Sequence, residues 1–151
     1  MLRILVFLAM ALGGGLASVA AQSNDKLDEL LSQPQARVDS TSYLVLTAAG
    51  LVPEDADLAT AFQTAIDQKL LPKNRLEGDP VSIEDLSFLV MKALKVPGGL
   101  EWTFLPNPRA AYRELAYYEL INASAGPARL VAGDEVVRTL NAVIAREGGR
   151  K

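Results

Sequence analysis

Residues 79–99, DPVSIEDLSFLVMKALKVPGG, are the stretch from which the rest of the chain can be interpreted. Ser82 and the acid three residues later, Asp85, match the capping box that begins many helices. The helix should end at residues 97–99, because proline followed by two glycines does not continue a helix. Apolar residues cover nearly all of its faces, which predicts a helix in the centre of a hydrophobic core. Its main apolar stripe consists of Leu86, Leu89, Val90, Ala93 and Leu94.

Four other segments have apolar residues at helical spacing, and with the central stretch they predict an all-α protein of about five helices. The first offers a Ser/Thr N-cap near position 40 and ends at Gly50 and Pro53. The third begins with Pro108, which suits the first turn of a helix. Only LEWTF, residues 100–104, predicts a brief extended segment. The four helical segments cover residues 40–53, 53–72, 107–123 and 131–147.

The helices also resemble one another at fixed spacing. A shift of 50 residues aligns Val81 with Val131 and Ala61 with Ala111, and a shift of 44 residues aligns the first helix with the central one. A single helical hairpin cannot bury its apolar stripe, whereas stacked hairpins complete one core. The spacing therefore predicts helix-loop-helix repeats that form one small bundle. The alternative is the general similarity that any two amphipathic helices share.

Length and composition restrict the classes of function. A chain of 151 residues with 50% hydrophobic content is typical of one globular domain. Its 15 Lys and Arg against 18 Asp and Glu give a formal charge of −3, so we expect no nucleic-acid partner. The chain has no Cys and no His, which excludes a disulfide framework, a zinc–thiolate site and a lipid-anchoring lipobox.

Residues 1–21 are predicted to be a signal peptide. Arg3 provides the positive start, residues 4–12 provide the apolar run, and small residues precede a cleavage site after Ala20 or Ala21. The alternative is an uncleaved membrane anchor, but the apolar run is about half of the roughly 20 residues that span a bilayer. No second apolar span follows, so we expect no integral membrane span after cleavage. The mature protein is expected to be exported, either to the periplasm or to the extracellular side of the cell envelope.

The rest of the chain divides into three parts. Residues 22–37 are polar and predict an N-terminal linker or a short helix that ends near Pro34. Residues 38–147 hold the predicted helices and form the helical repeat domain. Residues 148–151 form a short basic tail.

The order AF..AIDQKLLPKN..EGDPVSIEDLSFLVMKAL, residues 61–94, resembles the S-layer homology module. That module has one helix, a loop, and a second helix that begins with a Thr-Arg-Ala-Glu motif. Residues 81–86 stand at the start of the second helix. A second copy would cover residues 111–144, and residues 38–52 would close an incomplete first copy. The resemblance implies a helical domain that is associated with the cell envelope.

The sequence departs from this family at the residues that serve the family's function. The family's arginine helps to bind charged cell-wall polysaccharide, and its place is taken by Ile83 in one copy and Gly133 in the other. The family's aromatic opening is missing before Ala61, whereas Trp102 and Phe104 precede the first helix of the second copy. The resemblance therefore implies an envelope-associated domain but does not carry over the polysaccharide-binding residues.

The segment GGLEWTFLPNPRAAYRELAYYE, residues 98–119, contains the candidate binding residues. Aromatic and arginine side chains close together suit stacking on a glycan or the hot spots of a protein contact. The alternative is structural, with Trp102 and Phe104 covering the end of the bundle and the arginines solvated. The candidate binding residues are Trp102, Phe104, Arg109 and Arg113.

The sequence offers no evident catalytic or metal site. Without His or Cys, an enzyme needs a carboxylate pair, a Ser–Lys dyad or an activated tyrosine. The one enzyme class that we retain is a cell-wall glycan-cleaving enzyme with Glu101 or Glu114 as its acid. A calcium loop at residues 73–84 is disfavoured, because Lys73 and Arg75 occupy positions that must bind the metal. We therefore predict a non-catalytic domain, without metal or cofactor, that interacts with a cell-envelope glycan or an envelope protein; a purely structural envelope module is the remaining alternative.

Overall fold

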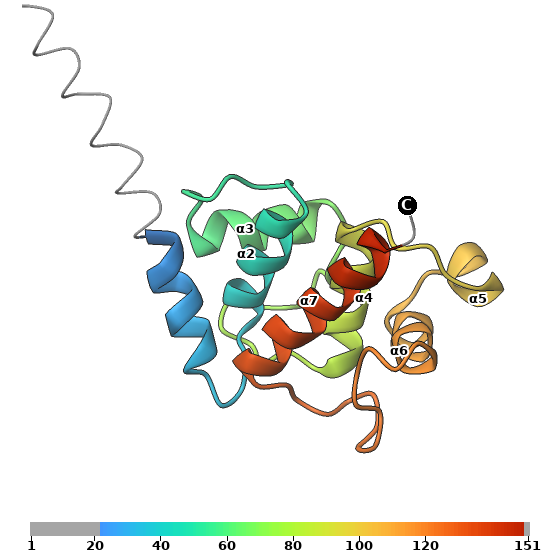
Figure 1. Cartoon of the computed structure of the whole chain (residues 1–151). Helices are drawn as coiled ribbons and strands as arrows, with labels where there is room; N and C mark the ends of the chain where they lie inside the picture. The colour runs from blue at the N-terminus through green and yellow to red at the C-terminus, as the bar shows by residue number, and fades with distance from the viewer. Residues whose placement is uncertain (1–21, 150–151) are drawn as a thin grey trace, which may run out of the picture.

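The computed structural model describes residues 22–149, which fold into helices joined by loops (Figure 1). Over this range the backbone contains no strand, and the prediction of an all-α protein is confirmed. The predicted number of about five helices is too low, because residues 22–31 and LEWTF are helical as well. The predicted signal peptide and the last two residues lie outside the described range. The later helices are α2 (Val38–Ala48), α3 (Leu58–Asp67), α4 (Ile83–Ala93), α5 (Leu100–Phe104), α6 (Pro108–Tyr117) and α7 (Gly133–Gly148).

The helix α4, which lies within the stretch quoted first, begins at the predicted capping box but ends at Ala93, before the predicted stop at residues 97–99. The Ser82 hydroxyl accepts the N–H of Asp85 at 3.2 Å and donates to the Asp85 carboxylate at 2.9 Å. At the other end, Lys95 has a left-handed backbone with φ of 54°. The N–H of Val96 then donates to the carbonyl of Met91 at 2.9 Å. This pattern is a Schellman motif, which satisfies the last carbonyls and turns the chain away from the helix axis.

The helix α2 begins two residues earlier than the predicted Ser/Thr N-cap near position 40. Its N-cap is Arg37, whose side chain makes no capping hydrogen bond. Instead the N–H of Val38, the first residue of the helix, donates to the carbonyl of Asp79 at 2.8 Å. A tertiary bond thus satisfies an N–H that a side chain would otherwise have to cap. Ser40 consequently lies inside the helix, where it is buried.

Three short segments, which precede α2, α4 and α7, bond to one another through their backbones. One residue in each segment both donates and accepts, and we call Ala36, Val81 and Val131 the hub. The N–H of Ala36 donates to Val131 at 2.8 Å, that of Val81 to Ala36 at 2.9 Å, and that of Val131 to Val81 at 3.0 Å. A second ring of N–H donors and carbonyls surrounds the first: Val38 to Asp79, Ile83 to Arg129 and Gly133 to Gln33, at 2.8, 2.8 and 3.0 Å.

The hub determines where the three central helices start. Each of these helices begins two residues after its own hub residue. The hub residues are spaced 45 and 50 residues apart in the chain. The second spacing equals the predicted shift between the central and the last helix, and the first is one residue more than the predicted shift of 44.

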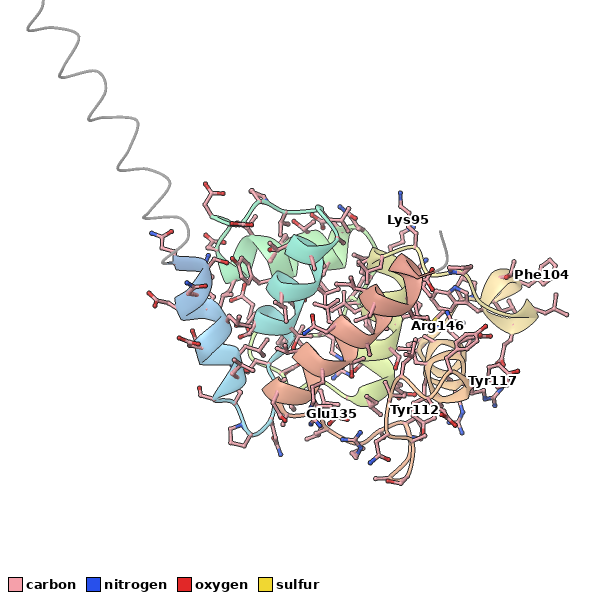
Figure 2. The ribbon with its side chains drawn as sticks, in the orientation of Figure 1. Lys95, Phe104, Tyr112, Tyr117, Glu135 and Arg146 are labelled. Carbon is pink, nitrogen blue, oxygen red and sulfur yellow. The ribbon has the colours of Figure 1, made fainter. Side chains whose placement is uncertain are left out.

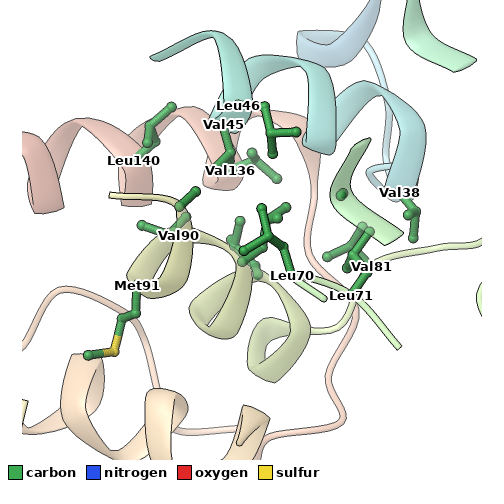
Figure 3. Close-up of a cluster of buried hydrophobic side chains, with 14 of the residues drawn as sticks. Val38, Val45, Leu46, Leu70, Leu71, Val81, Val90, Met91, Val136 and Leu140 are labelled. Atoms are coloured by element: carbon green, nitrogen blue, oxygen red, sulfur yellow. The ribbon is translucent and has the colours of Figure 1, made fainter. Parts of the chain in front are cut away.

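The core lies between α2, α4 and α7, with α3 packed on α2 and α6 packed on α4 (Figures 1 and 2). Each outer helix therefore lies mainly against the central helix that comes before it in the chain, not against the central helix that follows it. Leu46 of α2, Val90 of α4 and Val136 of α7 belong to one buried cluster with Leu70 (Figure 3). Leu89 and Val90 are only 1% and 0% exposed, as expected for the most central helix.

The helices α3 and α6 end in the same way, 50 residues apart. Lys69 and Glu119, just beyond the two helices, are left-handed with φ of 57° and 58°. The next residue in each case, Leu70 or Leu120, donates its N–H to the carbonyl five residues back, at 2.8 and 2.9 Å. Both turns are therefore Schellman motifs formed without glycine, although glycine adopts this conformation with the least strain.

Residues 22–31 form a helix that packs along α2. Leu30 is 1% exposed, and the ammonium group of Lys26 donates to the carbonyl of Ala56 at 2.6 Å. Residues 33–37 continue into the hub and its surrounding ring of bonds. The sequence left two interpretations open for residues 22–37, a linker or a short helix. The segment is a helix followed by residues that are hydrogen-bonded within the core.

Candidate functional site

Four large apolar side chains are strongly exposed at the end of the molecule that α5 and α6 form. Leu100, Phe104, Leu105 and Tyr117 have relative exposures of 78%, 74%, 71% and 80%. Phe104 and Tyr117 lie at the same end, far from the helix over residues 22–31 (Figure 2). We call these four residues the tip. Single exposed apolar residues are ordinary on a protein surface, whereas a group of them marks an interaction site.

A buried tryptophan anchors α5 to the body of the protein. The indole N–H of Trp102 donates to the carbonyl of Val96 at 3.1 Å, and only 8% of the residue is exposed. Its ring meets the edge of Phe88 with centroids 5.9 Å apart and planes at 82°. A Cβ atom at Gly98 would lie 2.6 Å from Trp102 Cδ1, so only glycine lets the chain pass the ring here. The face of α5 opposite to Trp102 is left to solvent.

Two polar contacts fasten α5 to α6. The Arg113 guanidinium donates to both carboxylate oxygens of Glu101, at 3.0 and 2.8 Å. The N–H of Gly99, the N-cap of α5, donates to the Glu114 carboxylate at 2.8 Å. An isolated helix of five residues is unstable in water. The tip therefore depends on these two contacts and on Trp102 for its shape.

The turn between α5 and α6 keeps Leu105 outside. Asn107 accepts the N–H of Ala110 at 2.9 Å as the N-cap of α6, and its amide donates to the carbonyl of Leu105 at 2.7 Å. Pro106 and Pro108 fix the backbone φ on either side of Asn107. The backbone of Leu105 is thus held by the start of α6 while its side chain stays in solvent.

Two surface hollows flank α5. One has a volume of about 390 Å³, lies beside the end of α4, and has Lys92, Lys95 and Trp102 in its lining. The other has a volume of about 410 Å³, lies beside α6, and has Arg113 and Tyr117 in its lining. The tip therefore lies between two hollows that have basic side chains at their edges. A partner can contact it from both sides.

The structure places the four predicted binding residues in three different environments. Trp102 is 8% exposed and borders the hollow beside α4, so most of its ring supports the tip and little of it is available to a ligand. Phe104 is exposed and forms part of the tip. Arg113 is paired with Glu101, whereas Arg109 is exposed and makes no ion pair with any residue in the described range. Phe104 and Arg109 are thus the two predicted residues whose chemistry is available to a partner.

Leu100, Leu105 and Tyr117 are not among the residues predicted from the sequence. On a helix, Leu100 and Phe104 are four residues apart and share a face, with Trp102 on the other side. In an extended segment, by contrast, all three would lie on one face. The sequence LEWTF thus contains the i, i+4 pair that forms part of the tip. The pair can be recognised only when the segment is known to be helical.

The carboxylates considered for catalysis have structural partners: Glu101 pairs with Arg113, and Glu114 accepts the N–H of Gly99. In the loop considered for calcium, Arg75 pairs with the Asp85 carboxylate. Among residues 22–149, no three acidic side chains gather in a way that could hold a metal ion. Over the same range, none of the helices combines the length and the apolar character needed to cross a bilayer.

A third hollow, with a volume of about 500 Å³, lies beside the start of α7 and is polar. Arg129 donates to both oxygens of the Glu135 carboxylate, at 2.8 and 2.6 Å, and this hydrogen bonding raises the pKa of Arg129. Arg138 pairs with Asp134 at 2.9 Å. Both arginines are already ion-paired within the protein. This hollow therefore has fewer groups free to bind a ligand than the tip has.

The chain was compared with protein-family models, with curated proteins and with solved structures, and none of them matches it. The geometry of the tip is consequently the basis of the functional proposal.

Proposed function

We propose that the protein is an exported, non-catalytic helical domain that binds a protein of the cell envelope through the tip. The observation that carries the proposal is the tip itself. Four large apolar side chains are exposed together on α5, on the residue that follows it and on the end of α6, and a buried tryptophan and two polar contacts hold α5 in place. Burying each such side chain against a partner is worth about 1.5–3 kcal/mol before the costs of association.

The chemistry of the tip favours a protein over a glycan. Glycan recognition uses aromatic ring faces together with polar groups, and Trp102, the largest ring, is turned inward. Two of the four tip residues, Leu100 and Leu105, are aliphatic and offer no face for stacking. Exposed Leu, Phe and Tyr side chains near Arg109, which has no ion-pair partner among residues 22–149, instead resemble the core and rim of a protein interface.

The rigidity of the tip adds to this proposal. A partner that binds a disordered loop must supply the free energy of ordering it, whereas a preformed surface avoids that cost. The Glu101–Arg113 pair and the Trp102 anchor hold the tip in one conformation before binding. The tip therefore has the properties of a preorganised docking element.

The proposal includes the internal repeat and the resemblance to the S-layer homology module. The cyclic bonding of the hub and the matching ends of α3 and α6 support helix-loop-helix units that form one bundle. Ile83 and Gly133, which take the place of the family's polysaccharide-binding arginine, are both buried. This burial supports a protein contact at the tip over the family's glycan contact. Export rests on the signal-peptide pattern of residues 1–21.

The proposal can be tested with the mature protein from Gln22, immobilised and exposed separately to envelope protein extract and to cell-wall sacculi. We expect the wild type to retain an envelope protein and the double variant L100S/F104S to lose it. The matched control is Leu76→Ser, which removes an apolar residue of 69% exposure from the loop before α4. This control should bind like the wild type, and circular dichroism should show that all three proteins are folded.

The other outcomes each identify a competing function. Retention on sacculi that survives L100S/F104S would show a glycan contact elsewhere and overturn the role of the tip. Release of soluble fragments from sacculi, abolished by Glu101→Gln or Glu114→Gln, would indicate a glycan-cleaving enzyme. Capture of neither material would leave a purely structural module as the better description.

A further inference from the structure

The end of the molecule opposite to the tip contains an apolar recess. It has a volume of about 180 Å³ and lies between the helix over residues 22–31 and α2. An apolar cavity of about 150 Å³ is known to hold a benzene ring, so this recess is large enough for one aromatic side chain. Its rim is open at Ala48, which is exposed at the end of α2. We call this cavity the recess. Its apolar lining consists of Leu27, Leu30, Tyr43, Leu44 and Ala48.

The segments that flank the recess are acidic, whereas the one charged residue in its lining is Lys26, whose ammonium group lies over the Tyr43 ring. The Lys26 bond to Ala56 and the bond that Tyr43 donates to the Glu54 carbonyl at 2.7 Å bring the loop after α2 against the N-terminal helix. Both segments are acidic, and residues 22–67 carry eight Asp or Glu but only two Lys or Arg, a formal charge of −6. Seven of these eight carboxylates are exposed and form no ion pair within the described part of the chain, and five of the seven lie on the two flanking segments ahead of the N-cap of α3: Asp25, Asp28, Glu29, Glu54 and Asp55.

The tip carries the complementary features. Phe104 supplies one exposed aromatic ring on a fixed helix. Arg109, at the start of α6, is exposed and has no ion-pair partner among the described residues. Residues 98–119, which contain the tip, carry two Arg and three Glu, a formal charge of −1 against −6 for residues 22–67, so this end is much less negative than the other. Opposite charge at two apolar surfaces favours their encounter and fixes their orientation.

We propose that the tip of one copy docks into the recess of a second copy, with Phe104 in the recess and Arg109 against the acidic segments that flank it. This inference rests on the proposed function of the tip and names its partner as another copy of the chain. The two surfaces lie at opposite ends of the molecule (Figures 1 and 2). A contact between two different surfaces does not close on itself as a twofold contact does, so it forms open-ended chains.

The experiment is sedimentation velocity of the mature protein over a wide range of concentration at low and high salt. The wild type should form species larger than a dimer that grow with concentration and shrink with added salt. Phe104→Ser removes the inserted ring, and Ala48→Lys places a cation at the mouth of the recess. Each variant alone should be monomeric, whereas a mixture of the two should form a one-to-one dimer and nothing larger, because one intact tip meets one intact recess.

Two further variants sharpen the result. Arg109→Glu should weaken association roughly fivefold and reduce its dependence on salt, as expected for one exposed ion pair. Leu76→Ser changes a residue of similar exposure that belongs to neither surface, and it should associate like the wild type. Circular dichroism of every variant excludes unfolding as the cause of any loss.

The inference is overturned by a wild type that stays monomeric at every concentration, or by a closed dimer that persists in Ala48→Lys. The second result would indicate contact between two tips. A mixture of Phe104→Ser and Ala48→Lys that fails to pair would also overturn it. If the monomeric protein still captures an envelope protein through the tip, the proposed function stands and only self-association is refuted.

Discussion

The hub and the tip both depend on short segments between the major helices, but they stabilise these segments in opposite ways. At the hub, three backbone strips far apart in sequence satisfy one another's N–H and carbonyl groups, and the hub residues are at most 1% exposed. At the tip, local contacts hold five residues in a helix whose apolar side chains face outward. Only Trp102 connects that helix to the buried interior.

This difference separates stability from function within one small domain. A change at the hub disturbs three helices at once, because each central helix starts from it. A change on the outer face of the tip disturbs only a partner, because the side chains there contact little of their own chain. The two regions should therefore respond differently to the same kind of substitution.

The largest difference in stability is expected between a carboxylate placed in the core and the same carboxylate placed at the tip. Val90→Asp puts a carboxylate on the fully buried face of α4, in the core that starts from the hub, where no partner can compensate its lost hydration. This variant should lose more than about 4 kcal/mol and be largely unfolded. Phe104→Asp places the same group in solvent and should change stability by less than about 0.5 kcal/mol. Urea unfolding followed by circular dichroism measures both, and a Val90→Asp protein as stable as the wild type would contradict the placement of α4.

The next contrast lies within the tip region itself. Trp102→Ala deletes a buried ring and its bond to Val96, which should cost about 3–5 kcal/mol. Tyr117→Ala deletes an aromatic ring that is 80% exposed and should cost less than about 0.5 kcal/mol. Thermal melts of the two variants and the wild type measure these losses of stability. Equal melting temperatures would mean that Trp102 does not anchor α5.

The fold was predictable from the sequence where local signals acted alone. Ser82 and Asp85 cap α4 as their spacing indicates, and Leu89 and Val90 are central as their stripe indicates. The start of α2 was not predictable from Ser40, because its first N–H is satisfied by Asp79 from a distant loop. The hub as a whole escaped prediction for the same reason. The 50-residue shift aligns Val81 with Val131, but side-chain spacing does not show that their backbones bond to each other and to Ala36.

The tip was predictable in part, since aromatic and arginine residues drew attention to residues 98–119. Its orientation was not, because it depends on α5 being helical rather than extended. Five residues are too few for a helical period to show, and α5 is helical only because Trp102, Glu101 and Gly99 have partners outside it. Tertiary contacts thus decided which side of the segment became the site.

A smaller effect tests the close packing beside the hub. A Cβ atom at Gly133, the first residue of α7, would collide with the backbone carbonyl of Leu30. Gly133→Ala should therefore push the N-terminal helix away and cost about 1–3 kcal/mol. Gly148, at the other end of α7, has nothing within 4 Å of such an atom, so Gly148→Ala should be neutral or stabilising by up to about 1 kcal/mol. Chemical unfolding that gives the same sign for both would refute this close approach.

The smallest effect concerns the turn that leads from the core to the tip. Lys95 has φ of 54°, a conformation that costs a side-chain-bearing residue more than it costs glycine. Lys95→Gly should relieve this strain and, after the greater freedom of glycine in the unfolded chain is subtracted, stabilise the protein by about 0.5–1 kcal/mol. Ala145→Gly, on the exposed face of α7, is the matched control and should destabilise by about 1 kcal/mol, because there glycine replaces a good helix former. Parallel urea titrations give both signs, and a Lys95→Gly protein that loses stability would show that the Lys95 side chain, at the edge of the hollow beside Trp102, contributes more to the turn than its backbone strain costs.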